Sequence, residues 1–296
     1  YFAPGADSDG DGISDADEIA YRMNPICPDD GSSDLDGDGI VSSQELAQQG
    51  HPRGGFSRYL AEGATGAFFT TELALLNPTD EPASVLLKFL TTTGQTIVHK
   101  RIVPPRTRHT LDVGTLAGLE AAEFSTLLES DVAVVLDRTL TWDGSSYGRH
   151  AETAPSAPSR LWYLAEGATH SGFELFYLLQ NPNAVDAAAV VSFLRPAPLA
   201  PIVRNYTVPA RSRFNIWVNL VDPGLAATDV SAEITTSHPV MVERALYRTN
   251  GGRTFNAGHE SAAVAAPALT WYLAEGATGP YFDLFVLLAN PQSVAA

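Results

Sequence analysis

The sequence predicts a mainly β protein, in which two tandem antiparallel β-sandwiches follow a small α domain at the N-terminus. Three observations predict it: a stretch that occurs three times, short apolar segments after two of its copies, and a pair of acidic, glycine-containing loops at the start of the chain. The 296 residues, of which 45% are hydrophobic, suffice for two or three domains with ordinary cores.

The repeated stretch sets the expected domain boundaries. It reads YLAEGATGAFFTTELALLNP at residues 59–78 and returns at residues 163–182 and 272–291, so successive copies start 104 and then 109 residues apart. This period is too long for one turn of a solenoid and suits a small domain. We expect four parts: a head at residues 1–52, β-sandwiches at residues 56–158 and 160–267, and an incomplete third repeat at residues 269–296.

The head contains two twelve-residue loops with the spacing of an EF-hand. Both have carboxylates at positions 1, 3 and 5, glycine at position 6 and glutamate at position 12. Calcium binds six to eight hard oxygen atoms, the glycine permits the sharp turn, and the glutamate can bind with both of its oxygens. The sequence therefore predicts two Ca²⁺ sites. Their candidate ligands are Asp7, Asp9, Asp11, the carbonyl of Ile13, Asp15 and Glu18 in the first loop, and Asp34, Asp36, Asp38, the carbonyl of Ile40, Ser42 and Glu45 in the second.

Each loop is expected to lead into a short helix, at residues 14–23 and 42–49, with no room for a helix before it. This arrangement resembles the paired loop-and-exit-helix units of dockerin-like domains and, more loosely, the Asp-rich calcium repeats of bacterial secreted proteins. The resemblance implies calcium and, less specifically, a protein partner. Because the head has little apolar core and crowds its carboxylates together, we expect it to be ordered only with calcium.

The residues that follow the first two copies of the repeated stretch predict short β-strands. We expect strands at residues 83–90, 96–103, 108–113, 124–128 and 132–140, and again at 187–194, 202–208, 213–218, 230–235 and 240–247. Strands of this length and number indicate antiparallel sandwiches of immunoglobulin type. The WYLAEGAT openings and the LLQNP and LLANP endings are similar to uncharacterised immunoglobulin-like repeats of bacterial secreted and surface proteins. That resemblance implies an extracellular architecture and names no reaction.

Charge and composition exclude several classes of partner. The formal net charge is −16, and residues 1–50 hold 12 acidic residues against one base. This balance argues against nucleic acid and anionic membranes, and its concentration in the head indicates cations. No apolar run reaches the roughly 18 residues of a membrane-spanning helix. The single cysteine, Cys27, excludes an intrachain disulfide, and the start at Tyr1 without a leader fits a processed secreted protein or a fragment.

No recurring set of residues predicts catalysis, and we expect no enzyme. The glutamates of the AEGAT motif are expected to bond nearby backbone amides, and Arg138 and Arg244 to form ion pairs or cover a sandwich edge. His150 and His259 are expected to make surface hydrogen bonds. The G-x-S-x-G pattern around Ser146 lies in a predicted hairpin tip, whereas a nucleophile elbow requires a strand, a tight turn and a helix.

The third repeat carries the run YFDLFVLL at residues 281–288, with seven apolar residues in eight. We expect a strand that needs a host, because burying each large side chain contributes about 1.5 to 3 kcal/mol and an open edge promotes association. The host is the rest of a longer protein, the chain's own second sandwich, or a sandwich of a neighbouring molecule. A segment that lies freely in solvent, or wholly within its own chain, would contradict assembly through a neighbouring molecule.

These observations predict an extracellular or cell-surface structural protein that binds calcium. We expect it to be a subunit of a head-to-tail filament, assembled by β-strand complementation through residues 271–296, because a head-to-tail contact that does not close produces a filament. The alternative is a dockerin-like tether or an adhesin stalk fragment that binds a protein receptor or a glycan. Neither hypothesis involves nucleic acid or membrane insertion.

Overall fold

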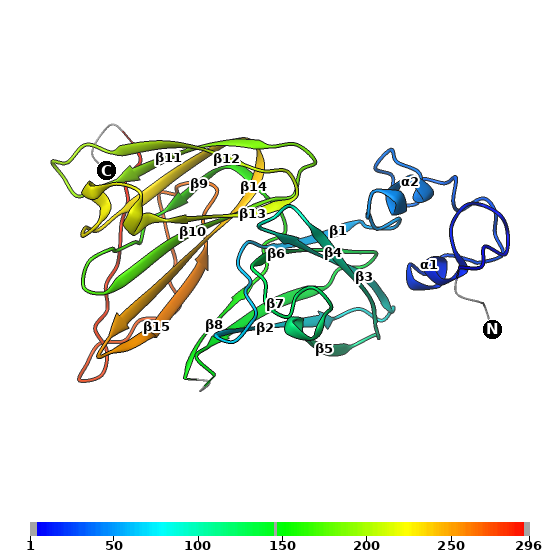
Figure 1. The fold of residues 1–296 in the computed structure, drawn as a ribbon, viewed down its shortest axis with the longest axis horizontal. Helices are drawn as coiled ribbons and strands as arrows, with labels where there is room; N and C mark the ends of the chain where they lie inside the picture. Colours follow the sequence, from blue (N-terminus) through cyan, green and yellow to red (C-terminus); the bar gives the residue numbers. More distant parts are fainter. Residues whose placement is uncertain (1–4, 145–146, 293–296) are drawn as a thin grey trace. The chain divides into compact units, whose positions relative to one another are not determined.

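A computed structural model describes residues 5–144 and 147–292, and their secondary structure is mainly β, with antiparallel sheets. Ser146, the serine of the G-x-S-x-G pattern, lies outside these residues. The chain forms two compact units. The first runs to Ala157 and includes Arg211–Arg213, and the second comprises Pro158–Ala210 and the residues from Phe214 onward. Figure 1 follows the chain from the two helices, drawn in blue, to the third repeat, drawn in red.

The head contains two helices, α1 (Asp15–Ala20) and α2 (Ser42–Ala47), both shorter than predicted. Two residues after the end of each helix, the chain adopts the left-handed conformation, at Arg22 with φ 58° and at Gln49 with φ 63°. The next amide then closes the turn, because Met23 N–H donates to the carbonyl of Glu18 at 2.7 Å and the corresponding bond forms after α2. This is a Schellman-type C-terminus, which satisfies carbonyls that the helix leaves unpaired.

The first β region (residues 56–153) consists of two four-stranded sheets. One sheet has the order β1 (Phe56–Leu60), β6 (Phe124–Ser130), β3 (Ala83–Thr91), β4 (Thr96–Val103), and the other β5 (Thr107–Asp112), β2 (Phe69–Asn77), β7 (Val135–Trp142), β8 (Gly148–Thr153). Both sheets contribute to one core, which includes Leu73 and Leu136 from the second and Leu87, Phe89 and Leu128 from the first. The two sheets therefore pack face to face, as the alternation of apolar residues along β2 predicts.

The second β region (residues 159–262) is organised around one long strand, β14 (Ser231–Asn250). The sequence predicts two strands here, at residues 230–235 and 240–247. Residues 231–236 of β14 pair with β11, and residues 241–248 pair with β10. Pro239 lies where the pairing with β9 shifts register, in keeping with the missing N–H of proline. The other strands are β9 (Ser159–Leu164), β10 (Phe173–Asn181), β11 (Ala187–Leu194), β12 (Ile202–Val208), β13 (Ser212–Trp217) and β15 (Arg253–Ala262).

The described part of the third repeat, residues 269–292, joins no sheet. One isolated bridge links Gly279 and Phe282. Residues 281–288 therefore form no strand within the single chain, and the prediction of a strand that pairs with a host in another molecule stays a prediction. Its side chains are largely exposed, from 44% for Leu287 to 91% for Tyr281. A strand requires a partner edge for its N–H and C=O groups, and no strand of the described residues supplies one to this segment.

Candidate metal centre

The first loop gathers four carboxylates around one point. Asp9, Asp11, Glu18 and Asp30 each offer a ligand oxygen, and these oxygens lie within 4.8 Å of one another. Glu18 has no exposed surface, and neither of its carboxylate oxygens has a hydrogen-bond partner in the part of the chain that the structure describes. Burying an unpartnered carboxylate is costly, so this side chain fits a position that is filled by a cation.

The electrostatics of the first loop support the same interpretation. Burial, together with the neighbouring charges of Asp9, Asp30 and Asp11, raises the pKa of Glu18 to about 7. Burial also raises the pKa of Asp30. Both shifts show that the negative charges are unfavourable in this arrangement by themselves. A divalent cation at the centre of the cluster reverses this effect, because it is then the largest local charge.

Two predicted ligands of the first loop lie outside this cluster. Asp7 accepts the N–H groups of Gly10 at 2.7 Å and Gly12 at 3.1 Å, and Asp15 accepts both the N–H and the hydroxyl of Ser8 at 2.8 Å. They hold the turns of the loop in place. Ile13 is buried, and its N–H donates to Asp11 at 2.8 Å.

Asp30 is the ligand that sequence reasoning missed. It follows the first loop by twelve residues, next to Asp29, and no spacing rule separates the two neighbours. The fold separates them, because Asn24 N–H donates to Asp30 at 3.0 Å and Gly31 N–H donates to Asp11 at 2.7 Å. A side chain on Gly31 would meet the Asp11 carboxylate at 2.5 Å. Only glycine therefore allows this approach.

The second loop brings Asp34, Asp36 and Asp38 together in the same way, with ligand oxygens within 4.8 Å of one another. Glu45 lies outside this group of three, but it is buried and its Oε2 has no partner among the described residues. Burial, together with the charges of Asp36 and Asp38, raises its pKa to about 8. Ser42 is turned away, because its hydroxyl donates to the carbonyl of Ser33 at 2.9 Å. The N–H of Ile40, whose carbonyl is the predicted donor, bonds to Asp38 at 2.8 Å.

Both loops are closed by the same backbone hydrogen bond. The residue at position 9 donates its N–H to the carbonyl of the residue before position 1, from Asp15 to Ala6 at 2.8 Å and from Ser42 to Ser33 at 2.9 Å. This bond fixes the start of each exit helix against the start of its loop. The glutamate at position 12, on the first turn of that helix, is thereby held near the loop carboxylates.

Each β region contains the same ion pair, between the glutamate of AEGAT and an arginine. Arg138 on β7 lies 3.4 Å from the Glu62 carboxylate and donates to the carbonyl of Glu62 at 2.9 Å. Arg244 on β14 lies 2.8 Å from Glu166 and donates to its carbonyl at 3.0 Å. The expected ion pairs of the two arginines are confirmed. The glutamates, expected to bond backbone amides, bind these arginines, and each ion pair joins the start of a β region to a strand near its end.

The two tip histidines lie beside these pairs. His150 Nε2 is 3.4 Å from the Glu62 carboxylate, and His259 Nε2 is 4.0 Å from that of Glu166. Burial and the charge of Arg244 lower the pKa of His259, while Glu166 opposes the shift. The repeated contacts are structural in character, because each one links segments of the same β region.

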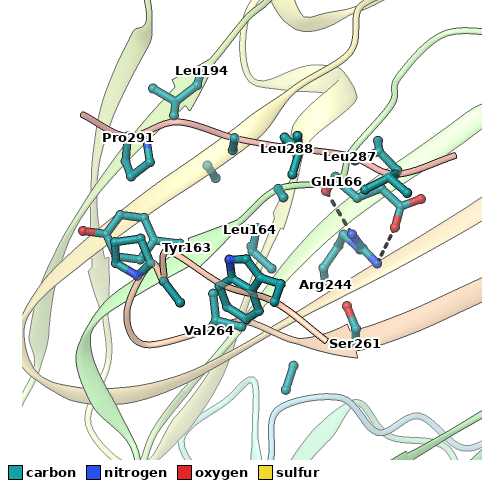
Figure 2. Close-up of a pocket in the computed structure, with 18 of the residues that line it drawn as sticks. Tyr163, Leu164, Glu166, Leu194, Arg244, Ser261, Val264, Leu287, Leu288 and Pro291 are labelled. Atoms are coloured by element: carbon teal, nitrogen blue, oxygen red, sulfur yellow. Dashed lines mark hydrogen bonds and ion pairs between the residues drawn. The ribbon is translucent and has the colours of Figure 1, made fainter. Parts of the chain in front are cut away.

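An apolar groove of about 400 Å³ lies between the second β region and the third repeat (Figure 2). Tyr163, Leu164 and Val264 lie on one side, and Leu287 and Pro291 from the third repeat lie on the other. The Glu166–Arg244 ion pair also lines the groove. The third repeat is therefore placed alongside its own second unit without being buried in it.

Comparisons with known proteins give no family and no function. No family model matches the chain, and no curated protein is similar to it. Among solved structures, Thermotoga maritima 1070 is similar at 11% identity with a TM-score of 0.34, over 37% of this chain and 96% of that one. The Anabaena sensory rhodopsin transducer shares 22% identity with a TM-score of 0.26, over 29% of this chain and 79% of that one. A Bacteroides uniformis beta-glucuronidase shares 9% identity, over 66% of this chain and 24% of that one, with a TM-score of 0.15.

Among the described residues, no helix has both the length and the apolar character needed to cross a membrane.

Proposed function

We propose that this chain is an extracellular structural protein whose head binds two calcium ions. The observation that carries the proposal is Glu18, a buried carboxylate without a partner that faces three aspartates. Carboxylates are the ligands that calcium prefers, and the loop spacing favours calcium over smaller cations that require a regular octahedron. The two β regions are, in this proposal, immunoglobulin-like sandwiches that hold the head and carry no reaction.

Calorimetric titration of the metal-free protein tests the metal assignment. We expect two Ca²⁺ ions per chain, with much weaker binding of Mg²⁺. Glu18→Gln is expected to remove one of the two binding events, and Asp29→Asn, at an exposed neighbouring carboxylate, to remove neither. A protein that binds no Ca²⁺, or that binds equally well after Glu18→Gln, contradicts the proposal.

The finer part of the proposal concerns assembly through residues 271–296. Residues 281–288 present apolar side chains that are 44% exposed or more, apart from the single acidic residue Asp283. A segment that lies open in solvent speaks against its donation to a neighbouring molecule. The open position of these residues in the single chain meets that condition. A donor strand is also exposed before it binds an acceptor sheet, because no strand of its own chain pairs with it. Whether the protein associates in solution therefore distinguishes a donor strand from a segment that stays unpaired.

Sedimentation and electron microscopy with calcium and with a chelator test this assembly. We expect calcium-dependent filaments that Phe285→Asp abolishes, because a charge at this position opposes burial in an acceptor sheet. Leu269→Asp is the matched control, since this residue is exposed but lies outside the apolar run. Monomers under all conditions, or filaments that survive Phe285→Asp, rule out strand complementation. Monomers that capture a protein receptor or a glycan would favour the alternative, a tether or an adhesin stalk.

A further inference from the structure

We propose that calcium controls the docking of the head on the first β region. The docking surface is formed by residues on or next to the strands β3, β4 and β6: Pro82, Ser84, Lys88, Lys100, Glu129 and Asp131. This inference rests on the proposed function, because calcium must bind for it to hold. It adds that each metal loop is followed, within six residues, by residues that contact this surface.

The end of the first exit helix contacts the docking surface directly. Two residues after Glu18, the carbonyl of Ala20 accepts the hydroxyl of Ser84 at 2.7 Å. Four residues after Glu18, Arg22 donates to the carbonyl of Pro82 at 2.6 Å and pairs with Asp131 at 2.9 Å. Asp131 has only 3% of its side chain exposed, so this ion pair is a partly desolvated one. Helix α1 thus carries a metal ligand and ends in a docking contact.

The helix also has an ion pair of its own with the surface. Asp17, which precedes Glu18, pairs with Lys100 on β4. Because adjacent residues on a helix point in different directions, Glu18 can face the loop carboxylates while Asp17 faces the β region. Displacing Glu18 therefore displaces this contact as well.

The second exit helix reaches the same place through His51. This residue is 1% exposed, its Nε2 lies 3.1 Å from both the carbonyl and the hydroxyl oxygen of Ser84, and its N–H donates to Glu129 at 3.1 Å. Tyr21, from the first helix, packs edge-on against the His51 ring with 4.8 Å between ring centroids. The two metal loops therefore converge on Ser84 from both halves of the head.

The second loop also shares a cavity with the docking surface. Asp36, Asp38 and Glu45 line it from the head, and Lys88 and Glu129 line it from the β region. Lys88 and Glu129 are paired at 2.6 Å, so the charge of Glu129 is partly neutralised where it faces the loop carboxylates. Glu45 is buried in this cavity, and its Oε2 has no hydrogen-bond partner among the described residues, so its charge faces the loop carboxylates and Glu129.

The second β region shows that the fold does not require this surface. It pairs the equivalent strands in the same register, so that Val85 opposite Ser130 corresponds to Ala189 opposite Thr236. On that register the polar members of the docking surface are replaced, with Ala188 for Ser84, Ser192 for Lys88, Thr235 for Glu129 and Ser237 for Asp131. Asp131 keeps one bond that belongs to the sheet, because it accepts the N–H of Ser84 at 2.8 Å just as Ser237 accepts that of Ala188 at 2.9 Å. Its ion pair with Arg22, and the contacts of Ser84 and Glu129 with the head, are additional to the sheet and specific to docking.

The positions of Glu18 and Glu45 link calcium binding to the docking of the head. In the metal-free head, Glu18 and Glu45 are buried charges that repel the loop carboxylates, so each exit helix is released from its loop. Bound calcium attracts both glutamates and fixes the helices, which places Ala20, Arg22 and His51 for docking. Because binding and docking are coupled, docking must in turn increase calcium affinity.

Distance measurement between two spin labels tests this coupling in the full chain. One label is placed on the native Cys27 in the head, and the other on Thr92→Cys, at an exposed turn of the first β region. With calcium we expect one narrow distance distribution, and after chelation a broad one. Calcium binding is measured on the same sample by calorimetry. A distribution that stays narrow after chelation overturns the inference but leaves calcium binding intact, whereas an absence of calcium binding overturns the proposed function as well.

Asp131→Asn separates docking from metal ligation. Asp131 is not a metal ligand, so this variant should still bind two Ca²⁺ ions, but with a broad distance distribution and with affinity reduced by about fivefold or more through the lost coupling. Asp80→Asn is the matched control, because Asp80 is an exposed aspartate that pairs with Arg106 and does not contact the head. An unchanged distribution in Asp131→Asn, or an equal effect of both variants, contradicts the assignment of this surface.

Discussion

Asp29 and Asp30 are adjacent in the sequence, but only Asp30 joins the acidic cluster of the first loop. Asp29 is exposed, and its backbone carbonyl accepts hydrogen bonds from two serine hydroxyls. Asp30 is half-buried, accepts the N–H of Asn24, and directs its other oxygen into the cluster without a partner among the described residues. The role of a carboxylate here depends on a turn that joins the two loops, which local spacing does not reveal.

Asp30→Asn is expected to weaken the first calcium site by about tenfold to a hundredfold, because it removes one anionic ligand, and to leave the second site unchanged. Calorimetric titration resolves the two sites. Asp29→Asn is the matched control and should bind as the unaltered protein does. Equal affinities in the two variants would show that Asp30 does not contact the ion.

The raised pKa values of Glu18 and Glu45, to about 7 and about 8, predict a pH dependence of the metal-free head. Both folded-state values lie above the unfolded value of 4.5, so the folded head binds more protons and its stability falls as the pH rises toward 8. Burial lowers the pKa of His51 to about 4, so this histidine is neutral above about pH 7 and does not oppose the effect there.

We therefore expect the metal-free head to be less resistant to protease at about pH 9 than at about pH 7. Limited proteolysis in metal-free buffer, normalised to an unrelated substrate at each pH, measures this difference. Saturating calcium should remove it, because both glutamates are then held ionised by the cation. Greater resistance at the higher pH would contradict the assigned burial.

At the scale of elements, the end of β2 is fixed by one buried side chain. The amide of Asn77 donates to the carbonyls of Glu81 at 2.7 Å and Val103 at 3.0 Å, and its oxygen accepts the N–H of Thr79 at 3.0 Å. Asn181 makes the same bonds at the end of β10. Asparagine before proline thus ties each strand to the turn that follows it and to the end of another strand, β4 for Asn77 and β12 for Asn181.

Asn77→Ala is expected to destabilise the first β region by about 2 to 4 kcal/mol, because it leaves buried backbone groups unsatisfied. Urea unfolding followed by circular dichroism measures the change. Asn290→Ala removes the third copy of this asparagine, which is exposed, and should cost less than about 0.5 kcal/mol. Similar losses in the two variants would show that the buried hydrogen bonds of Asn77 contribute little.

At the scale of the whole molecule, calcium is expected to stabilise one unit and not the other. The head belongs to the first unit, and the second unit holds none of the acidic loops. At a calcium concentration of 100 times Kd, each site adds about 2.7 kcal/mol to the folded state. Scanning calorimetry with calcium and with a chelator should therefore move one transition and leave another in place. A common shift of all transitions would contradict this division.

The sequence by itself determined that the fold is mainly β, with antiparallel sheets. Strand periodicity, turn residues and the threefold YLAEGAT stretch are local signals, and a local signal suffices where each residue needs only its own neighbours. The same holds for the carboxylate spacing of the two loops. The continuous strand β14 escaped prediction, because it pairs with different strands along its length and Pro239 resembles a break.

Only the tertiary structure decided which distant side chains meet. It placed Asp30 beside the carboxylates of the first loop and paired Glu62 with Arg138. It also brought His51 into contact with Ser84, which lies 33 residues away in the sequence. It also left residues 281–288 outside every sheet of the described chain, although their composition predicts a strand. The physical reason is the same in each case. A buried charge or an unpaired edge is stabilised by whatever group the packing brings to it, and packing depends on the whole chain.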